Sequence, residues 1–261
     1  MTDADVRVDD ALRWGSAAVA TAAGTHFDDS RGPVAGKLAA FPRFVDRTSI
    51  GRFLVKSRIF DQVLPVQGSI VECGVHDGGG LFTWAHLSAL LEPLNHRRQV
   101  IGFDTFGGFP SVHEEDLTTG SEHAFVGNYA GATRAELEQA IALFDRGRAL
   151  SHLPKIELVE GDFTKIGPRY VAANPHLVVS LLYLDFDLYE PTKVALDVFL
   201  PLMPAGAVLA FDEVHTRDFP GETTAMIESL DLPRLRLQRA PMTSICWAVL
   251  TGDERRYSET S

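Results

Sequence analysis

The chain has 261 residues and a formal net charge of −11, with 45% hydrophobic and 23% charged residues. This length and composition suit a globular protein with one large domain or two small ones. The acidic charge argues against nucleic-acid binding, which needs a basic face to displace counterions. We expect a cytoplasmic protein without a membrane partner, because the chain starts without a basic signal region and lacks any run of about 18 apolar residues.

The first part of the chain, residues 1–65, is predicted to be an N-terminal helical extension. Residues 50–63 carry apolar side chains at helical spacing, and Pro65 and Gly68 then break the helix. We expect this extension, and its segment 41–47 above all, to supply substrate contacts or a dimer surface. A homo-oligomer, dimeric or larger, is therefore expected.

Residues 66–261 are predicted to form a second domain in which strands and helices alternate. Near-continuous apolar strands of this kind indicate a parallel sheet covered on both faces. The runs 235–239 and 244–250 are too close in sequence for a crossover helix, so an antiparallel hairpin is predicted at one edge. The predicted fold is α/β, with a doubly wound, mostly parallel seven-stranded sheet and one antiparallel strand near its C-terminal edge. The other predicted strands are 69–75, 99–104, 155–160, 178–185 and 207–212, and the predicted helices are 81–91, one starting at Thr133, 168–173 and 191–200.

A glycine-rich turn, residues 72–80, follows the first strand and contains Glu72, Gly74 and Gly78. Glycines let the backbone turn tightly and approach a ligand closely. The acid before the first glycine suits an amino group better than a pyrophosphate. Asp104 ends the next strand, where nucleoside-binding folds place an acid on the ribose hydroxyls. A nucleoside site is predicted; the alternative is that the turn is only a tight structural connection.

A third cofactor contact is predicted at Asp162 and Phe163, which follow the strand 155–160. An acid and an aromatic ring at this position would border an adenine. The alternative is an ordinary turn, because Gly-Asp is a common turn pair.

Acidic residues also end two later strands, at Asp185 and Asp187 and again at Asp212 and Glu213. Neighbouring parallel strands deliver their ends to the same edge, so these carboxylates would repel one another unless a cation lies among them. Oxygen donors favour Mg²⁺ or another hard divalent cation. The alternative for each acid is capping of the helix that follows.

Residues 105–132 form a long stretch with several glycines and are interpreted as a mobile lid over the site. A surface excursion without a catalytic part is the alternative.

Four segments together resemble the macrocin O-methyltransferase family, whose members use S-adenosylmethionine and Mg²⁺ to methylate sugar hydroxyls in antibiotic biosynthesis. The resemblance extends from about residue 41 to about residue 221 and is closest to the branch acting on deoxysugars, such as the rhamnose of enediyne antibiotics. It implies a small-molecule sugar or glycoside as substrate. The segments are 72–80, 101–110 (IGFDTFGGFP), 184–193 (LDFDLYEPTK) and 211–214 (FDEV).

The resemblance also implies roles for single residues. Asp185 falls where a general base is proposed, beside the cofactor. Two positions depart from the family pattern: Glu213 stands where an aspartate is usual, and His76 stands where an aromatic residue is usual. The implied metal ligands are Asp187, Asp212 and Glu213, and the implied cofactor-binding residues are Glu72, Gly74, His76, Gly78, Asp104 and Thr105.

Three other functions stay open on the sequence. A nicotinamide-dependent oxidoreductase would use the glycine turn and the ribose acid but would leave the later acids unexplained. A metal-dependent hydroxylase or hydrolase would use those acids without S-adenosylmethionine. A protein that binds the nucleoside without catalysis is the third.

Overall fold

The computed structural model describes residues 17–241 and 243–252, which belong to two compact units. The smaller unit comprises the described residues up to Val55 together with Pro241 and Thr243. Its described helices are α2 (Ala17–Asp29), α3 (Val34–Ala39), a 3₁₀ turn (Phe41–Arg43) and the beginning of α4 (Arg47–Val63). Within it the Phe27 ring meets Phe44 edge-on at 5.1 Å, and the Lys37 ammonium lies 4.7 Å from the Phe27 centroid.

The larger unit begins inside α4, at Lys56, earlier than the domain boundary predicted after residue 65. The helix predicted over 50–63 is present and starts at Arg47. The apolar side chains at helical spacing in this helix were expected to share one buried face, and this is only partly correct. Ile59, Phe60 and Val63 are fully buried, whereas Phe53 and Leu54 are exposed. The inward face of the later turns therefore decides how α4 packs.

The larger unit is built on a seven-stranded sheet in the order β3-β2-β1-β4-β5-β7-β6. Strands β1 to β5 pair in parallel, and β7 runs antiparallel to both β5 and β6. This confirms the predicted fold class, including the reversed strand near the C-terminal edge. The strands are β1 (Ser69–Cys73), β2 (Val100–Asp104), β3 (Ile156–Glu160), β4 (Val179–Leu184), β5 (Val208–Phe211), β6 (Gln238–Arg239) and β7 (Cys246–Val249).

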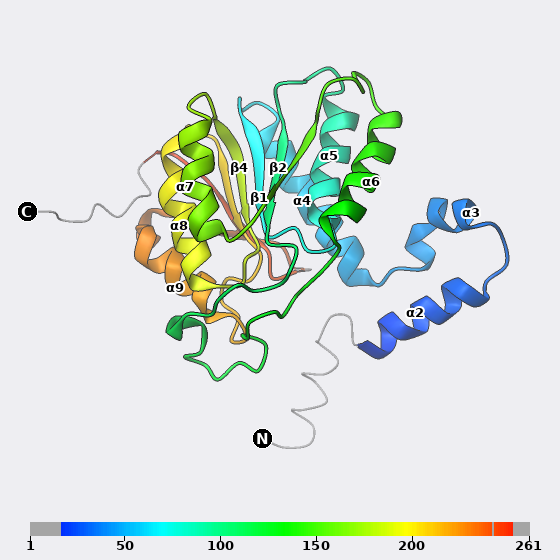
Figure 1. Cartoon of the computed structure of the whole chain (residues 1–261), viewed down its shortest axis with the longest axis horizontal. Helices are drawn as coiled ribbons and strands as arrows, with labels where there is room; N and C mark the ends of the chain where they lie inside the picture. Colours follow the sequence, from blue (N-terminus) through cyan, green and yellow to red (C-terminus); the bar gives the residue numbers. More distant parts are fainter. Residues whose placement is uncertain (1–16, 242, 253–261) are drawn as a thin grey trace, which may run out of the picture. The chain divides into compact units, whose positions relative to one another are not determined.

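Helices cover both faces of the sheet, as the continuous apolar strands require. Figure 1 shows α7, α8 and α9 along one face and α5 and α6 along the other. The core under α7 to α9 includes the fully buried Phe103, Phe199 and Phe211. The helix bounds are α5 (Gly79–Leu91), α6 (Arg134–Arg146), α7 (Phe163–Ala173), α8 (Tyr189–Phe199) and α9 (Pro220–Ser229).

Local signals explain where most helices start. The predicted capping box of α6 is present: Thr133 accepts from the Glu136 N–H at 3.3 Å, and the Glu136 carboxylate accepts from the Thr133 N–H at 2.8 Å. Helix α7 starts at Phe163, five residues before its predicted start, because Asp162 caps it and Pro168 lies inside it. Helix α9 was not predicted from the sequence, since its apolar residues show little helical periodicity.

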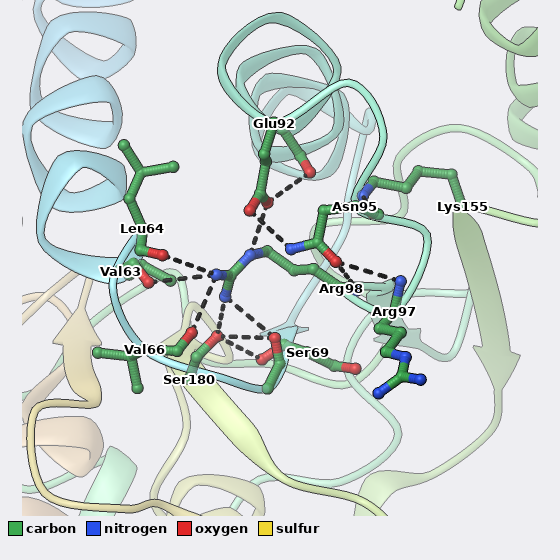
Figure 2. A network of polar contacts seen from close by, with 12 residues as sticks. Val63, Leu64, Val66, Ser69, Glu92, Asn95, Arg97, Arg98, Lys155 and Ser180 are labelled. Carbon is green, nitrogen blue, oxygen red and sulfur yellow. Dashed lines mark hydrogen bonds and ion pairs between the residues drawn. The ribbon is translucent and has the colours of Figure 1, made fainter. Parts of the chain in front are cut away.

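A buried arginine joins the carboxyl ends of α4 and α5 to the beginnings of β1 and β4 (Figure 2). Arg98 is 3% exposed and pairs with Glu92 through its Nε atom at 2.6 Å. One terminal nitrogen donates to the Gly68 carbonyl at 3.0 Å and to the Ser180 hydroxyl at 2.6 Å, and the other donates to the Val66 carbonyl at 2.9 Å. The guanidinium thus satisfies carbonyls at the end of α4 and before β1, opposite the edge that carries the predicted site.

Among the described residues, no helix is both long and apolar enough to cross a membrane.

Candidate functional site

The carboxyl ends of β1, β4 and β5 bring the glycine turn and the acid pairs to one edge of the sheet. Cys73 pairs with Leu184 in register, and Leu184 pairs with Phe211. Gly74, Asp185 and Asp212 therefore follow three adjacent strands at the same level. The N–H of Asp185 donates to the Cys73 carbonyl at 2.8 Å, and the N–H of Asp212 donates to the Leu184 carbonyl at 2.9 Å.

Two glycines of the turn lie so close to other atoms of the chain that a side chain would not fit there. Gly74 has φ +93°, and a β-carbon there would overlap the backbone carbonyl of Asp185. A β-carbon at Gly80 would overlap the carboxylate of Glu72, which is 1% exposed. The Glu72 side chain thus lies buried against the first turn of α5, and only glycine leaves room for it at residue 80.

Asp104 fastens the glycine turn to the end of β2. Its Oδ2 atom accepts from the N–H groups of Val75 at 2.7 Å and His76 at 2.9 Å, and its Oδ1 atom accepts from the Phe106 N–H at 2.7 Å. A carboxylate offers about four acceptor sites, so these bonds leave capacity for a ligand. The ribose contact stays a prediction, and the structure adds a role in shaping the turn.

Of three more predicted cofactor residues, His76 and Gly78 lie in this turn and Thr105 lies just after β2. The Nδ1 atom of His76 lies 3.3 Å from the Asp77 carboxylate, with the imidazole half exposed. Gly78, with φ +82°, is the cap residue before α5. The Thr105 hydroxyl donates to the Gly108 carbonyl at 2.6 Å and so closes the turn that leaves β2.

At the predicted adenine border, Asp162 and Phe163 both have structural contacts of their own. Asp162 caps α7 by accepting from the Thr164 N–H at 3.1 Å and pairs with Lys165 at 2.7 Å. The Phe163 ring is 3% exposed and packs against Phe103 at 5.2 Å. The ring of Phe163 therefore belongs to the core, Asp162 acts as a helix cap, and the adenine contact stays a prediction.

The acids that follow β4 and β5 differ in burial and in hydrogen bonding. Asp212 is 2% exposed and accepts a hydrogen bond from the Tyr183 hydroxyl. Asp185, Asp187 and Glu213 are half-buried, and Asp187 has φ +62°. At this edge of the sheet, one carboxylate is therefore buried and hydrogen-bonded to a tyrosine, and three others are partly exposed to solvent.

A further carboxylate, Glu222 in the first turn of α9, was not predicted from the sequence. It is fully buried, its Oε1 atom accepts from the Glu213 N–H at 3.1 Å, and its buried Oε2 atom has no hydrogen-bond partner among the residues that the structure describes. Burial, then the negative charges of Asp187, Asp212 and Asp185, raise the pKa of Glu222 well above the usual range. The acid is isolated in sequence, so no pattern indicated that it joins the site.

The donor chemistry of this edge fits a hard cation, because carboxylates gather there and raise the pKa of a buried neighbour. The side chains are not arranged as a finished ligand set. Within 17–241 and 243–252, no three His, Cys, Asp or Glu side chains are grouped so as to hold a metal ion. The predicted metal ligands therefore stay a proposal.

The segment 105–132 is anchored beside these acids, next to the start of α9 (Figure 1). Asp116 is 2% exposed and accepts from the Tyr189 N–H at 2.7 Å and from the His113 N–H at 2.8 Å. A β-carbon at Gly221 in α9 would overlap the Asp116 carboxylate. This anchor holds the middle of the segment, so any lid movement would have to occur on either side of Asp116.

Backbone strain also gathers at this edge. Positive φ values are uncommon in residues other than glycine and are often retained at functional sites. In the described part of the chain, all such residues except Leu150 lie at the carboxyl end of the sheet or in the adjoining loops. They are His76, Phe106, Tyr129, Asp187 and His215.

The model of one protein family, Macrocin-O-methyltransferase (TylF), matches residues 54–244. The chain belongs to this family. A comparison with curated protein sequences finds no significant match.

Solved structures agree with this family membership. A crystal structure of CalS11, a calicheamicin methyltransferase, is 33% identical over 89% of this chain and 91% of that chain, with a TM-score of 0.85. The apo structure of CalS11, TDP-rhamnose 3′-O-methyltransferase, is 31% identical over 89% of this chain and 93% of that chain, with a TM-score of 0.76. The O-methyltransferase NovP, 20% identical over 77% and 80% of the two chains with a TM-score of 0.62, shares the fold.

These findings confirm the predicted family, the predicted fold and the predicted function of an S-adenosylmethionine-dependent sugar O-methyltransferase. The oxidoreductase, hydroxylase or hydrolase and non-catalytic alternatives are set aside accordingly.

Proposed function

We propose that the chain methylates one hydroxyl group of a deoxysugar linked to a nucleoside diphosphate, using S-adenosylmethionine as the methyl donor and Mg²⁺ as a second cofactor. The observation that carries this proposal is the likeness to CalS11, a TDP-rhamnose 3′-O-methyltransferase, at 31% identity over 89% of this chain. The joining of a glycine turn and an acid cluster at one sheet edge supports it.

The proposed cofactor half is the glycine turn with Glu72, Gly74 and Asp104. Glu72 is buried beneath the start of α5 and would provide negative charge toward the amino group of the methionine part. Asp104, already bonded to the turn through three N–H groups, would accept from a ribose hydroxyl at its remaining acceptor site. His76, Gly78 and Thr105 would shape the walls around this half.

The proposed metal half is Asp187, Asp212 and Glu213. A bound divalent cation lowers the pKa of a coordinated hydroxyl and orients it. Asp185 follows β4 directly and would accept the hydroxyl proton at its carboxylate, acting as general base. The sugar oxygen would form its bond to the methyl carbon as the bond between that carbon and the sulfonium sulfur breaks, which leaves S-adenosylhomocysteine. The tyrosine bond to Asp212 would keep that ligand in place.

We also propose that the N-terminal extension supplies a surface for substrate or for self-association. Val34, Leu38 and Phe41 of the smaller unit are 60%, 62% and 46% exposed, and Val34 and Leu38 share one face of α3, so they can form an apolar contact surface. Light scattering on the purified chain tests the oligomer: a monomeric mass at every concentration would contradict it.

The proposed function is tested by incubating the protein with S-adenosylmethionine and a panel of nucleoside-diphosphate deoxysugars, and by mass spectrometry for the gain of one methyl group. A parallel panel of glycosides, and parallel reactions with EDTA or with added Mg²⁺, complete the design. Methylation of a nucleotide-linked sugar that EDTA abolishes is the expected result. Methylation of glycosides alone would contradict the acceptor class, and full activity in EDTA would contradict the metal.

A further inference from the structure

Tyr129, in the segment 105–132, lies between the two halves of the site. Its ring centroid is 6.1 Å from that of His76 in the glycine turn, 5.5 Å from Phe109 and 5.8 Å from Phe219 before α9. Phe109 and Phe219 are each 8% exposed and form a small apolar cluster with Leu188. Tyr129 itself is 44% exposed. One aromatic ring therefore spans from the proposed cofactor turn to the helix that carries Glu222.

The backbone around Tyr129 is held in place by paired hydrogen bonds. The Phe109 N–H donates to the Asn128 carbonyl at 2.9 Å, and the Gly127 N–H donates to the Phe109 carbonyl at 2.9 Å. A β-carbon at Gly131 would come within 2.5 Å of the His76 carbonyl carbon, so the chain just after Tyr129 presses on the glycine turn. Tyr129 keeps φ +56° within this frame, which is a costly conformation for a tyrosine.

The phenol of Tyr129 is within reach of the charges of Asp187 and Glu213 in the proposed metal half. Burial, then the charges of Asp187, Glu213 and Asp218, raise the pKa of Tyr129 above its ordinary value. A phenol has an ordinary pKa of about 10, so it is neutral at physiological pH and can donate a hydrogen bond to a bound molecule. Because the ring is partly exposed, a bound molecule at this edge has access to it.

We propose that Tyr129 positions the acceptor sugar, its hydroxyl donating a hydrogen bond to a sugar oxygen and its ring covering an apolar face of the sugar. The proposal rests on the proposed function and adds a specificity residue to it. A deoxysugar offers both groups: hydroxyls that lie beside the acids, and C–H and methyl surface that packs against an aromatic face. Phe109 and Phe219 would support the ring from behind.

The test compares Tyr129→Phe with the matched control Tyr170→Phe. Tyr170 donates to Glu157 at 2.8 Å between α7 and β3, so its variant also removes one phenol hydroxyl but away from the acids. Steady-state kinetics give kcat and KM for the acceptor, calorimetry gives the Kd of S-adenosylmethionine, and thermal unfolding gives Tm. Tyr129→Leu, which removes the ring as well, is measured in the same way.

The expected result is a KM for the acceptor raised about tenfold in Tyr129→Phe, the effect of one lost hydrogen bond. Its Kd for S-adenosylmethionine and its Tm should match the wild type, Tyr129→Leu should raise KM further, and Tyr170→Phe should leave KM unchanged. A wild-type KM in Tyr129→Phe overturns the inference while the proposed function stands. Weakened cofactor binding or a lowered Tm in Tyr129→Phe also overturns it, because the role would then be structural. A wild type that methylates no sugar overturns both.

Discussion

The backbone N–H of Glu213 donates a hydrogen bond over 3.1 Å to the Oε1 atom of Glu222, a glutamate that is fully buried. This bond ties the loop after β5 to the first turn of α9. A second bond, from the His215 N–H to the Thr223 hydroxyl at 2.9 Å, repeats the connection two residues later. The position of a proposed metal ligand therefore depends on a helix that follows it in the chain.

Replacement of Glu222 should separate the role of this bond from that of the charge. Glu222→Gln keeps a carbonyl oxygen for the Glu213 N–H, whereas Glu222→Leu removes it. We expect the Kd of Mg²⁺, measured by calorimetry with S-adenosylhomocysteine present, to rise about tenfold in the leucine variant, the equivalent of one lost hydrogen bond. The glutamine variant should bind Mg²⁺ like the wild type. Equal Mg²⁺ affinity in the leucine variant would show that Glu222 does not position Glu213.

The adjacent glycines at the start of α5 offer a matched pair. An added β-carbon at Gly80 overlaps the Glu72 carboxylate, while one at Gly79 meets nothing within 4 Å. Gly80→Ala should displace Glu72 and weaken S-adenosylmethionine binding by tenfold or more, on the order of a lost charge-assisted hydrogen bond. Gly79→Ala should bind the cofactor normally and should be about as stable as the wild type or slightly more so, since alanine favours helix. Calorimetry and Tm measure both, and equal cofactor affinity in the two variants would count against a role for Glu72.

Asp187→Ala should abolish methyl transfer and leave cofactor binding intact, because Asp187 belongs to the metal half of the proposed site. We expect a loss on the order of a hundredfold or more in kcat, as for other groups that stabilise developing charge. Asp197→Ala, an exposed aspartate on α8, is the control and should be fully active. Initial rates and calorimetry are the measurements. If Asp187→Ala loses its affinity for S-adenosylmethionine, Asp187 has been assigned to the wrong half.

Stability should depend on pH through Lys155. This lysine is 5% exposed, its Nζ atom donates to the Asn95 carbonyl at 2.9 Å, and burial lowers its pKa to about 8. Between about pH 8 and the ordinary value of 10.5, the unfolded chain binds this proton and the folded chain does not, so the contribution to the free energy of unfolding rises with pH. Below about pH 8, Lys155 is charged in both the folded and the unfolded chain, so the destabilisation caused by burying its charge no longer changes with pH.

Lys155→Met removes this buried charge at the cost of one hydrogen bond. The difference in Tm between the variant and the wild type should therefore be most favourable to the variant at pH 7 and should shrink by a few degrees by pH 10. Lys165→Met, at a side chain that is 72% exposed, should show no such trend. A pH-independent Tm difference for Lys155→Met would mean that Lys155 titrates normally.

Several features of the site followed from local sequence alone. The five parallel strands and β7 were predicted close to their observed positions because each is a short run rich in apolar residues, whereas the strand predicted over 235–239 spans only Gln238–Arg239. The start of α6 was predicted because the capping box of Thr133 and Glu136 is a local interaction. The meeting of Glu72, Asp185 and Asp212 at one edge was predicted because parallel strands end at the same side of a sheet. The helix predicted over 168–173 starts earlier, at Phe163, because Asp162 caps it.

The amino-acid sequence by itself determined the family, the sheet and the identity of most acids at its edge, since these depend on short patterns within single strands and turns. Only the tertiary structure showed Glu222 and Tyr129 beside those acids. Both lie in segments whose apolar residues follow neither helical nor strand spacing. Their positions at the edge depend on contacts between residues far apart in the chain: Phe219 with Tyr129, and Gly221 with Asp116. Such contacts depend on how the segments pack against one another, which no local pattern encodes.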